Sequence, residues 1–293
     1  MGFTLSTDTS CDIFRNELKA AGVEYRPLVY TIDDVPYFDE FTADADYKAF
    51  YDLIRAGKMP TTSQINIAEH EEFFNMLCDK YDGEIVHITL SSGLSSTYES
   101  ACAAAKTVNA RYGCDRIYVV DSLGATITVR HVVEEAIRLR DAGVCAADAA
   151  KRLAGFTAHL HTWFMPTDLM HLRRGGRVSG ASAVLGTALN IKPILTINDV
   201  GGLSVVQKVI GVGKGIKLMA SKVAKNAASA SHKIYVASAD SNFAQELLDA
   251  VKAARPDCEA EIGWIGPVIG AHTGCGAAGV AFVSDKPRTE MLD

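Results

Sequence analysis

Short apolar runs of strand length alternate with helical patterns through the first half of the 293-residue chain. Residues 85–90 are apolar and rich in β-branched side chains, residues 97–110 are rich in alanine, and residues 116–120 return to a strand pattern. This alternation is typical of a parallel sheet that is covered by helices. We therefore predict a doubly wound α/β domain over residues 1–155, with a mainly parallel sheet.

The same patterns place the other elements of this domain. Asn66, followed three residues later by Glu69, has the spacing of a capping box and predicts that a helix begins at residue 67. The further predicted strands are residues 3–6 and 25–31, and the further predicted helices are residues 13–21, 44–56, 67–81 and 125–141.

The second half of the chain changes period and favours a sheet that is at least partly antiparallel. Val200-Gly201-Gly202-Leu203 lies between two strand patterns and is a hairpin signal. Predicted strands are residues 163–166, 194–197, 203–209, 234–238, 259–264 and 279–283, and predicted helices are residues 146–160, 214–226 and 242–254. We expect a second α/β domain over residues 156–293, with a mixed or antiparallel sheet and covering helices.

Composition and charge exclude several classes of protein. Hydrophobic residues make up 48% of the chain and charged residues 22%, which excludes a disordered, collagen-like or coiled-coil chain. The net charge of −6 argues against nucleic acid as the main partner. No apolar run reaches about 18 residues, so we expect no membrane span, while transient contact with a membrane stays open.

Cysteine spacing and the first residues bear on cofactors and location. The seven cysteines are odd in number and form no Cys-x-x-Cys pair, which favours reduced thiols over disulfides or a zinc site. The N-terminus has no basic segment of the kind that opens a signal peptide. We therefore expect a cytoplasmic protein with no metal site and no cofactor.

A run of hydroxyl side chains follows the strand predicted at residues 85–90 and enters the next helix. It reads Ser91-Ser92-Gly93-Leu94-Ser95-Ser96-Thr97. Free backbone N–H groups, the positive end of the helix dipole and hydroxyl donors suit a carboxylate or a phosphate. Helix capping and turn formation account for the same residues without a ligand.

Two further segments have small and polar residues where a strand ends or a helix begins. The first contains Thr61, Thr62 and Ser63, and the second is a glycine-dense stretch around His272. Ligands of parallel α/β sheets bind outside the carboxyl ends of the strands, which makes such segments candidates for a binding site. Structural glycines at a sheet corner are the alternative for the stretch around His272.

Ser95, Asp121 and His272 occur in the chain order of an α/β-hydrolase triad, which raises a serine acyl hydrolase as an alternative function. The match to a nucleophile elbow is incomplete, because Thr97 stands where Gly-x-Ser-x-Gly has its last glycine. Several residues also separate Ser95 from the preceding strand, whereas the elbow places its serine directly after the strand.

Three arginines, Arg173, Arg174 and Arg177, surround a glycine pair. One interpretation is the last turn of a helix with a glycine cap. The other is a basic docking surface, since arginine holds carboxylate and phosphate groups with two hydrogen bonds. The second interpretation predicts an acidic partner for this face.

Together these segments resemble the DegV family, the fatty-acid-binding proteins that include the B subunits of bacterial fatty acid kinases. The resemblance rests on Thr7-Asp8-Thr9-Ser10, Thr61-Thr62-Ser63-Gln64, residues 91–98, Val119-Val120-Asp121-Ser122, and residues 172–179 and 269–274. These matches run nearly from end to end. They imply a two-domain α/β fold with a long acyl chain buried between or within the domains.

The resemblance also implies roles for the candidate residues. Thr62 and Ser95 would hold the carboxylate of a long-chain fatty acid, with His272 close by. The remaining members of these headgroup loops are Thr61, Ser63 and Ser96. Such a protein is a carrier rather than an enzyme, because a separate ATP-dependent kinase subunit makes the acyl phosphate. Arg173, Arg174 and Arg177 would then be candidates for contact with that kinase.

The chain departs from the family pattern at two positions. Ile65 follows Thr-Ser-Gln where the family usually has proline, and Cys275 replaces the proline of His-x-Gly-Pro-Gly. Neither change removes a polar contact, so we expect headgroup binding to persist. Chain length, saturation, the protonation of His272, the oligomeric state and the presence of a kinase partner stay open at this point.

Overall fold

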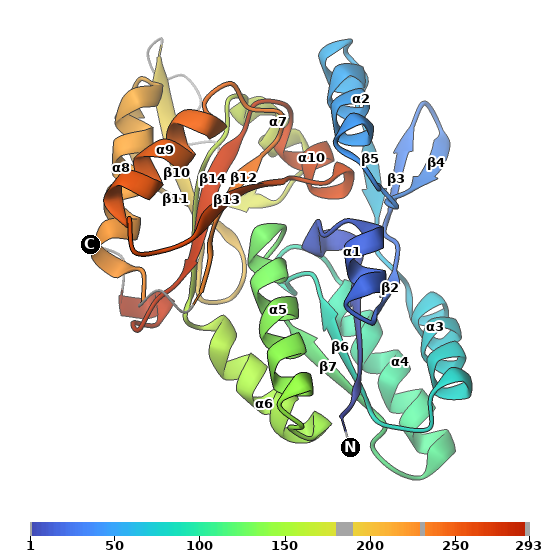
Figure 1. Cartoon of the computed structure of the whole chain (residues 1–293). Coiled ribbons are helices and arrows are strands. Elements are labelled where there is room, and N and C mark those ends of the chain that lie inside the picture. Colours follow the sequence, from blue (N-terminus) through green and yellow to red (C-terminus); the bar gives the residue numbers. More distant parts are fainter. Residues whose placement is uncertain (1, 180–189, 229–231, 291–293) are drawn as a thin grey trace.

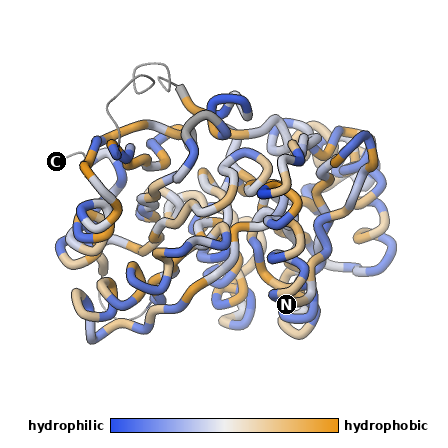
Figure 2. Tube along the Cα trace, turned by 90° about the horizontal axis from the view of Figure 1, so that it is seen from above, coloured by the Kyte–Doolittle hydropathy of each residue, from blue (hydrophilic) through white to orange (hydrophobic). Residues whose placement is uncertain are grey.

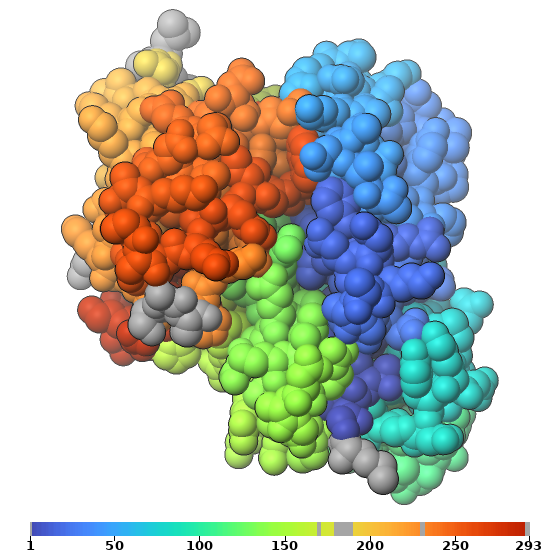
Figure 3. All heavy atoms as spheres, viewed as in Figure 1, coloured from blue at the N-terminus to red at the C-terminus, as the bar shows by residue number. Residues whose placement is uncertain are grey.

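The computed structural model describes residues 2–179, 190–228 and 232–290. Figure 1 shows a lower body built on a parallel sheet, an upper body built on a mixed sheet, and a small three-stranded sheet beside the upper body. The space-filling view in Figure 3 shows that early, blue segments of the chain reach up beside the late, orange segments. The predicted α/β class, with one parallel and one mixed sheet, is confirmed.

The lower sheet is parallel and has the strand order β2-β1-β6-β7. Its strands are β1 (Thr4–Asp8), β2 (Val23–Arg26), β6 (Ile85–Thr89) and β7 (Ile117–Asp121). One face packs on α3 (Ile67–Lys80) and α4 (Thr97–Tyr112), and the other on α1 (Arg15–Ala20), α5 (Ile127–Asp141) and α6 (Ala146–Thr157). Helices on both faces of a parallel sheet are the doubly wound arrangement that the sequence predicts.

A capping box begins α3, as the spacing of Asn66 and Glu69 predicts. The Asn66 side chain accepts from the Glu69 amide at 3.1 Å, and the Glu69 carboxylate accepts from the Asn66 amide at 2.8 Å. These bonds satisfy amides that the first turn of a helix leaves unpaired. Further along, Phe73, Phe74 and Leu77 pack against α4 and the sheet.

Residues 28–66 form a flap that the sequence predicts only in part. The single strand predicted at residues 25–31 is wrong, because the chain forms β2 in the lower sheet and then β3 (Val29–Ile32) in a separate sheet. Pro27 lies between them and has no amide hydrogen with which to continue a strand ladder. β3 pairs with the unpredicted strands β4 (Val35–Phe38) and β5 (Thr61–Ser63), and α2 (Asp44–Arg55) lies where a helix is predicted.

The flap packs on the upper body through aromatic residues of α2. Tyr47 stacks on Trp264 with ring centroids 5.1 Å apart, and the Tyr51 hydroxyl donates to the Ile265 carbonyl at 2.6 Å. Part of the N-terminal half therefore closes against the C-terminal sheet. Residue 155 lies within α6, and the division into domains 1–155 and 156–293 stays a prediction.

The upper sheet is mixed, with the order β13-β12-β14-β8-β10-β11-β9. Its strands are β8 (Leu160–Met165), β9 (Val178–Ser179), β10 (Ile191–Ile197), β11 (Leu203–Ile210), β12 (Ile234–Ser238), β13 (Ala260–Trp264) and β14 (Ala278–Val283). α8 (Val212–Asn226) and α9 (Ala244–Ala254) cover its outer face. Seen from above, the outer helices alternate hydrophilic and hydrophobic residues (Figure 2), as helices with one buried face do.

Local signals in the second half are accurate to a few residues. β10 and β11 pair antiparallel, and Asn198 accepts from the Gly202 amide at 2.8 Å in the turn, so the predicted hairpin is confirmed. The helix predicted to residue 160 ends at Thr157, because Leu160 begins β8. The glycine-dense stretch contains the unpredicted helix α10 (Pro267–Thr273), which Pro267 starts at the first helical position.

Candidate functional site

A cavity of about 400 Å³ lies between the carboxyl edge of the lower sheet, the flap and the upper sheet. The loops that follow β6 and β7 form one side, β5 and α10 form the other, and strands of the upper sheet form the back. This volume is within the range of small-molecule binding sites. The position also agrees with the rule that ligands bind outside the carboxyl ends of parallel strands.

Most of the cavity wall is apolar. The apolar side chains that the upper body contributes include Phe164, Ile197, Leu203, Ile265, Val268 and Ile269. Leu90 and Ile127 come from the lower body, and Leu28 comes from the flap. Such a wall removes hydrocarbon from water without offering it polar partners. The ligand that fits this surface has a substantial apolar part.

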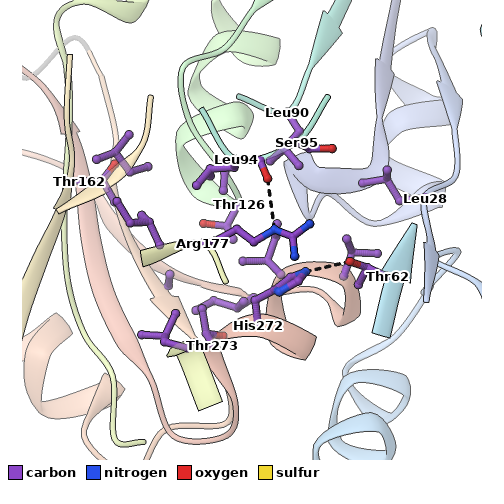
Figure 4. A pocket seen from close by; sticks show the side chains of 18 of the residues that line it. Leu28, Thr62, Leu90, Leu94, Ser95, Thr126, Thr162, Arg177, His272 and Thr273 are labelled. Atoms are coloured by element: carbon purple, nitrogen blue, oxygen red, sulfur yellow. Dashed lines mark hydrogen bonds between the residues drawn. The ribbon is translucent and has the colours of Figure 1, made fainter. Parts of the chain in front are cut away.

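Thr62 and His272 meet at the polar end of the cavity. Thr62 lies on β5 opposite Tyr30 of β3, and His272 lies in the last turn of α10. Thr62 Oγ1 and His272 Nε2 are 2.8 Å apart, and both side chains line the cavity (Figure 4). The bond joins the flap to the upper body across 210 positions in the sequence.

The surroundings of His272 keep its imidazole neutral. Burial, together with the charges of Arg177 and His171, lowers the pKa of His272 to about 4. Its Nδ1 lies against the backbone of Gly175. At neutral pH the ring therefore carries no charge, and Nε2 can donate or accept one hydrogen bond with a hydroxyl.

Two acidic side chains fix the loop that follows β6. Asp8, which is fully buried at the end of β1, accepts from the amides of Ser10 at 2.9 Å and Leu90 at 2.8 Å. Asp121 accepts from the Ser92 amide at 3.2 Å. Burial raises the pKa of Asp8, and its hydrogen bonds oppose that rise. These bonds hold the start of the hydroxyl loop at a defined place on the sheet edge.

Ser95 lies at the start of α4 and lines the cavity. Its hydroxyl accepts from the Thr97 amide at 3.3 Å and lies 2.9 Å from Thr97 Oγ1. The capping role expected for this loop is thus present. It coexists with exposure to the cavity, because a hydroxyl has one hydrogen and two lone pairs to distribute.

The three arginines do not act as one group. Arg177 lines the cavity, where its Nη1 donates to the Gly175 carbonyl at 2.6 Å and its Nε to the Leu94 carbonyl at 3.4 Å (Figure 4). Arg173 and Arg174 are exposed at the end of α7 (Leu169–Arg174) and do not line the cavity. Arg177 is exposed as well, so it lies at the solvent-facing rim of the cavity, whereas Arg173 and Arg174 lie on the surface away from it.

Most of the candidate residues from the sequence meet at this cavity. Those that line it are Thr62, Ser63, Ser95, Ser96, His272 and Arg177. Thr61 precedes Thr62 on β5, is exposed and does not line the cavity. Gln64, which belongs to the segment Thr61-Thr62-Ser63-Gln64, lines the cavity as well, and sequence reasoning missed the lining residues Thr126 and Thr162. A signal for Thr126 existed, because it follows the strand next to β6 in the predicted parallel sheet.

The arrangement does not favour the serine acyl hydrolase. Within the described residues, the Ser95 hydroxyl is bonded to Thr97, whereas His272 is bonded to Thr62. The nucleophile and the base of the alternative are therefore not joined by a hydrogen bond. Asp121 is engaged by backbone amides rather than by the imidazole.

The described residues contain neither a metal-binding cluster nor a helix that could cross a membrane. There, no group of three or more His, Cys, Asp or Glu side chains is placed to hold a metal ion. Nor does any helix in residues 2–179, 190–228 and 232–290 have the length and apolar character needed to cross a bilayer. The seven cysteines form no disulfide.

Comparison with known proteins gives consistent matches. The sequence profile of the DegV family of uncharacterised proteins matches residues 3–285. A DegV domain-containing protein of Clostridium perfringens is 31% identical over 285 residues, which cover 97% of this chain and 98% of that protein.

Two solved structures are similar over nearly the whole chain. A DegV family protein of Thermus thermophilus, described for its fatty acid binding, has a TM-score of 0.84 and 28% identity, covering 97% of this chain and 100% of its own. DegV of Bacillus subtilis, described as a fatty acid binding protein, has a TM-score of 0.81 and 28% identity at the same coverage.

Proposed function

The chain belongs to the DegV family, and from this membership we propose that it binds a long-chain fatty acid in the cavity between its two sheets. The observation that carries the proposal is the contrast between polar and apolar side chains in the cavity wall. The hydroxyl of Thr62, the imidazole of His272 and the Ser95 loop gather in one part of the cavity (Figure 4). Thr162 and Thr273 add hydroxyls elsewhere, and apolar side chains form most of the remaining wall. The fatty acid binding described for the Thermus thermophilus and Bacillus subtilis relatives supports it.

The apolar wall supplies most of the affinity in this proposal. A chain of about 15 methylenes that leaves water gains roughly 12 kcal/mol of gross free energy, at about 0.8 kcal/mol per methylene, before ordering costs are subtracted. The polar end has a smaller task, which is to replace the water that solvates one carboxylate. Charge-assisted hydrogen bonds from Thr62 and Ser95 are suited to that task.

Arg177 supplies the positive charge that the carboxylate needs. Because burial lowers the pKa of His272 to about 4, its imidazole offers a hydrogen bond rather than a full charge at neutral pH. The Arg177 guanidinium lines the same cavity and carries its charge at all physiological pH values. We assign the ion pair with the ligand to Arg177 and the shorter hydrogen bonds to the hydroxyls.

We further propose that the protein presents its bound acid to a separate ATP-dependent kinase subunit in the cytoplasm, which forms the acyl phosphate. Arg173 and Arg174 are exposed beside the segment that carries Arg177 to the cavity, and they suit acidic groups on such a partner. In this role the chain is a carrier and has no catalytic residue of its own.

Extraction and titration test the lipid-binding proposal. Protein purified without added lipid, extracted with organic solvent and analysed by mass spectrometry should yield a fatty acid of about 14 to 18 carbons. After delipidation, calorimetry should show uptake of oleate or palmitate at one site per chain. A stably folded protein that is empty and binds neither acid would contradict the proposal. Turnover of p-nitrophenyl esters that is lost in Ser95→Ala would favour the hydrolase instead.

Charge reversal tests the docking surface. Arg173→Glu combined with Arg174→Glu should abolish acyl phosphate formation by an added fatty acid kinase subunit, while the extracted lipid stays at the wild-type amount. Loss of lipid from the double variant would show that these arginines act on the cavity, which contradicts a separate docking face.

A further inference from the structure

The residue that precedes α5 has a backbone conformation that is rare for its side chain. Thr126 has φ +56° and ψ −128°, a region that glycine occupies readily and that β-branched residues avoid. Its amide donates to the Ser10 carbonyl at 2.8 Å, and its carbonyl accepts from the Arg130 amide at 3.0 Å. The amide and the carbonyl of Thr126 are therefore both hydrogen-bonded. These bonds keep the residue in a backbone conformation that threonine otherwise avoids.

The Thr126 side chain does not perform the usual task of a threonine at this position. A threonine that precedes a helix generally accepts from an amide of the first turn, but Thr126 makes no such bond to α5. Among the residues that the structure describes, none forms a hydrogen bond with its hydroxyl, although only 6% of the residue is exposed. Because Thr126 lines the cavity and no group of the described chain occupies its hydroxyl, that hydroxyl is available to a ligand there.

Thr126 lines the cavity (Figure 4), as do Ala125 and Ile127 on either side of it in the sequence. This segment follows β7, and the Ser95 loop follows β6, which pairs in parallel with β7. Both segments therefore lie at the same edge of the lower sheet. The positive end of the 15-residue helix α5 begins here, which favours a negatively charged ligand group.

We propose that the Thr126 hydroxyl donates a hydrogen bond to the carboxylate of the bound fatty acid, as a third hydroxyl beside those of Thr62 and Ser95. This inference rests on the proposed function of the cavity. The unusual backbone keeps the hydroxyl in the cavity and away from the amides of α5, which would otherwise occupy it. Thr126 then contributes to selection of an ionised headgroup over an uncharged one.

Three substitutions distinguish the contribution of the Thr126 hydroxyl to binding from the contributions of its backbone conformation and side-chain volume. Thr126→Ser keeps the hydroxyl, Thr126→Val keeps the shape without the hydroxyl, and Thr126→Gly removes the side chain where glycine suits the backbone. Thr107→Val, at an exposed position on α4, is the matched control for loss of a hydroxyl. The probes are oleate and oleyl alcohol, and the thermal midpoint of the delipidated protein is measured for each variant.

We expect Thr126→Val and Thr126→Gly to bind oleate about tenfold more weakly than the wild type, with the affinity for oleyl alcohol unchanged. Thr126→Ser should retain the oleate affinity within about twofold. Thr126→Gly should not lower the thermal midpoint, because the backbone strain is relieved. Weaker oleate binding with an unchanged or higher midpoint separates ligand contact from a merely structural role.

Wild-type oleate affinity in both Thr126→Val and Thr126→Gly would overturn the inference while leaving the proposed function intact. An equal loss for oleate and oleyl alcohol would also overturn it, because the residue would then shape the cavity rather than contact the carboxylate. If the wild type itself binds no oleate, the proposed function fails, and the inference fails with it.

Discussion

The two sides of the cavity's polar end are built differently. The loop wall, residues 90–96 and 122–126, is fixed through backbone amides that bond to Asp8 and Asp121. The closing wall consists of Thr62 on β5 and His272 on α10, joined by one side-chain hydrogen bond. Donors held through the backbone are preorganised, whereas the closing wall depends on how the flap packs on the upper body. We infer that the loop wall sets the headgroup position and that the closing wall completes it.

Removal of the Asp8 side chain should disrupt the loop wall, and we expect it to lower the unfolding free energy more than any other substitution proposed here. Asp8→Ala leaves the buried amides of Ser10 and Leu90 without an acceptor, and each such group costs about 1 to 3 kcal/mol. Removal of a buried carboxylate offsets part of this cost, so we expect a net loss of about 2 to 4 kcal/mol in unfolding free energy. Urea denaturation measures it, and oleate affinity should fall as well.

Asp79→Ala is the matched control, because Asp79 is an exposed acid on α3. It should change the unfolding free energy by less than about 0.5 kcal/mol. If Asp8→Ala is no more destabilising than this control, the loop wall does not depend on the Asp8 network.

Thr62→Ala and Ser95→Ala remove one donor from each wall. Each variant should lose about 1 to 3 kcal/mol of oleate binding free energy, because a buried carboxylate then lacks a partner. Ser95→Ala should also lower the unfolding free energy by about 1 kcal/mol, since the Ser95 hydroxyl accepts from the Thr97 amide that begins α4. Calorimetry of both single variants and the double variant measures the coupling between the walls. Unchanged oleate affinity in both single variants would refute this headgroup site.

The pH dependence of stability tests the closing wall through His272. Since the pKa of His272 is lowered to about 4 in the fold, its contribution is fully present above about pH 6.5, where the unfolded chain is also neutral. As the pH falls from 6.5 to 4, the unfolded state gains a proton that the folded state does not, so stability is lost. His272→Asn should therefore show a flatter curve across this window.

The unfolding free energy of His272→Asn should still depend on pH in this window, because burial also lowers the pKa values of His70 and His161 to about 4. The informative quantity is thus the change in unfolding free energy between pH 7 and pH 4.5, measured for the wild type and for His272→Asn. This change should be larger in the wild type. Parallel curves for the two proteins would show that His272 is not protected from protonation in the fold.

Substitution of the arginines should give the smallest effects on lipid affinity. Arg177→Gln should weaken oleate binding by about 1 kcal/mol or less, because Arg177 is exposed to solvent. Arg173→Gln, on the exposed end of α7, serves as the matched control and should leave the affinity unchanged. Equal effects of the two substitutions would contradict the separation of Arg177 from the surface pair.

Local patterns were sufficient to predict the frame of the cavity. Periodicity and turn chemistry detect features that depend on residues close together in the sequence. Such features are the α3 capping box, the hairpin at Gly201 and Gly202, and the strand patterns of β6 and β7. The hydroxyl loop after β6 was a candidate because a parallel sheet gathers its strand ends at one edge.

Other features depend on contacts between distant segments. The three-residue strand β5 has too little periodicity to detect, and its pairing with β3 is what places Thr62 at the cavity. The positive φ of Thr126 accompanies a bond to Ser10, which lies in the 3-10 turn (Thr9–Cys11) that follows β1. Arg177 separates from Arg174 because α7 ends between them and Gly176 turns the chain with φ +71°.

A crystal structure of the protein saturated with oleate would show directly whether the cavity holds a fatty acid with its carboxylate at the Thr62 and Ser95 hydroxyls. We predict electron density for the acyl chain along the apolar wall, with the carboxylate within hydrogen-bond distance of the Thr62 and Ser95 hydroxyls. A cavity without ligand density at saturating oleate, or a carboxylate turned away from both hydroxyls, would contradict the account.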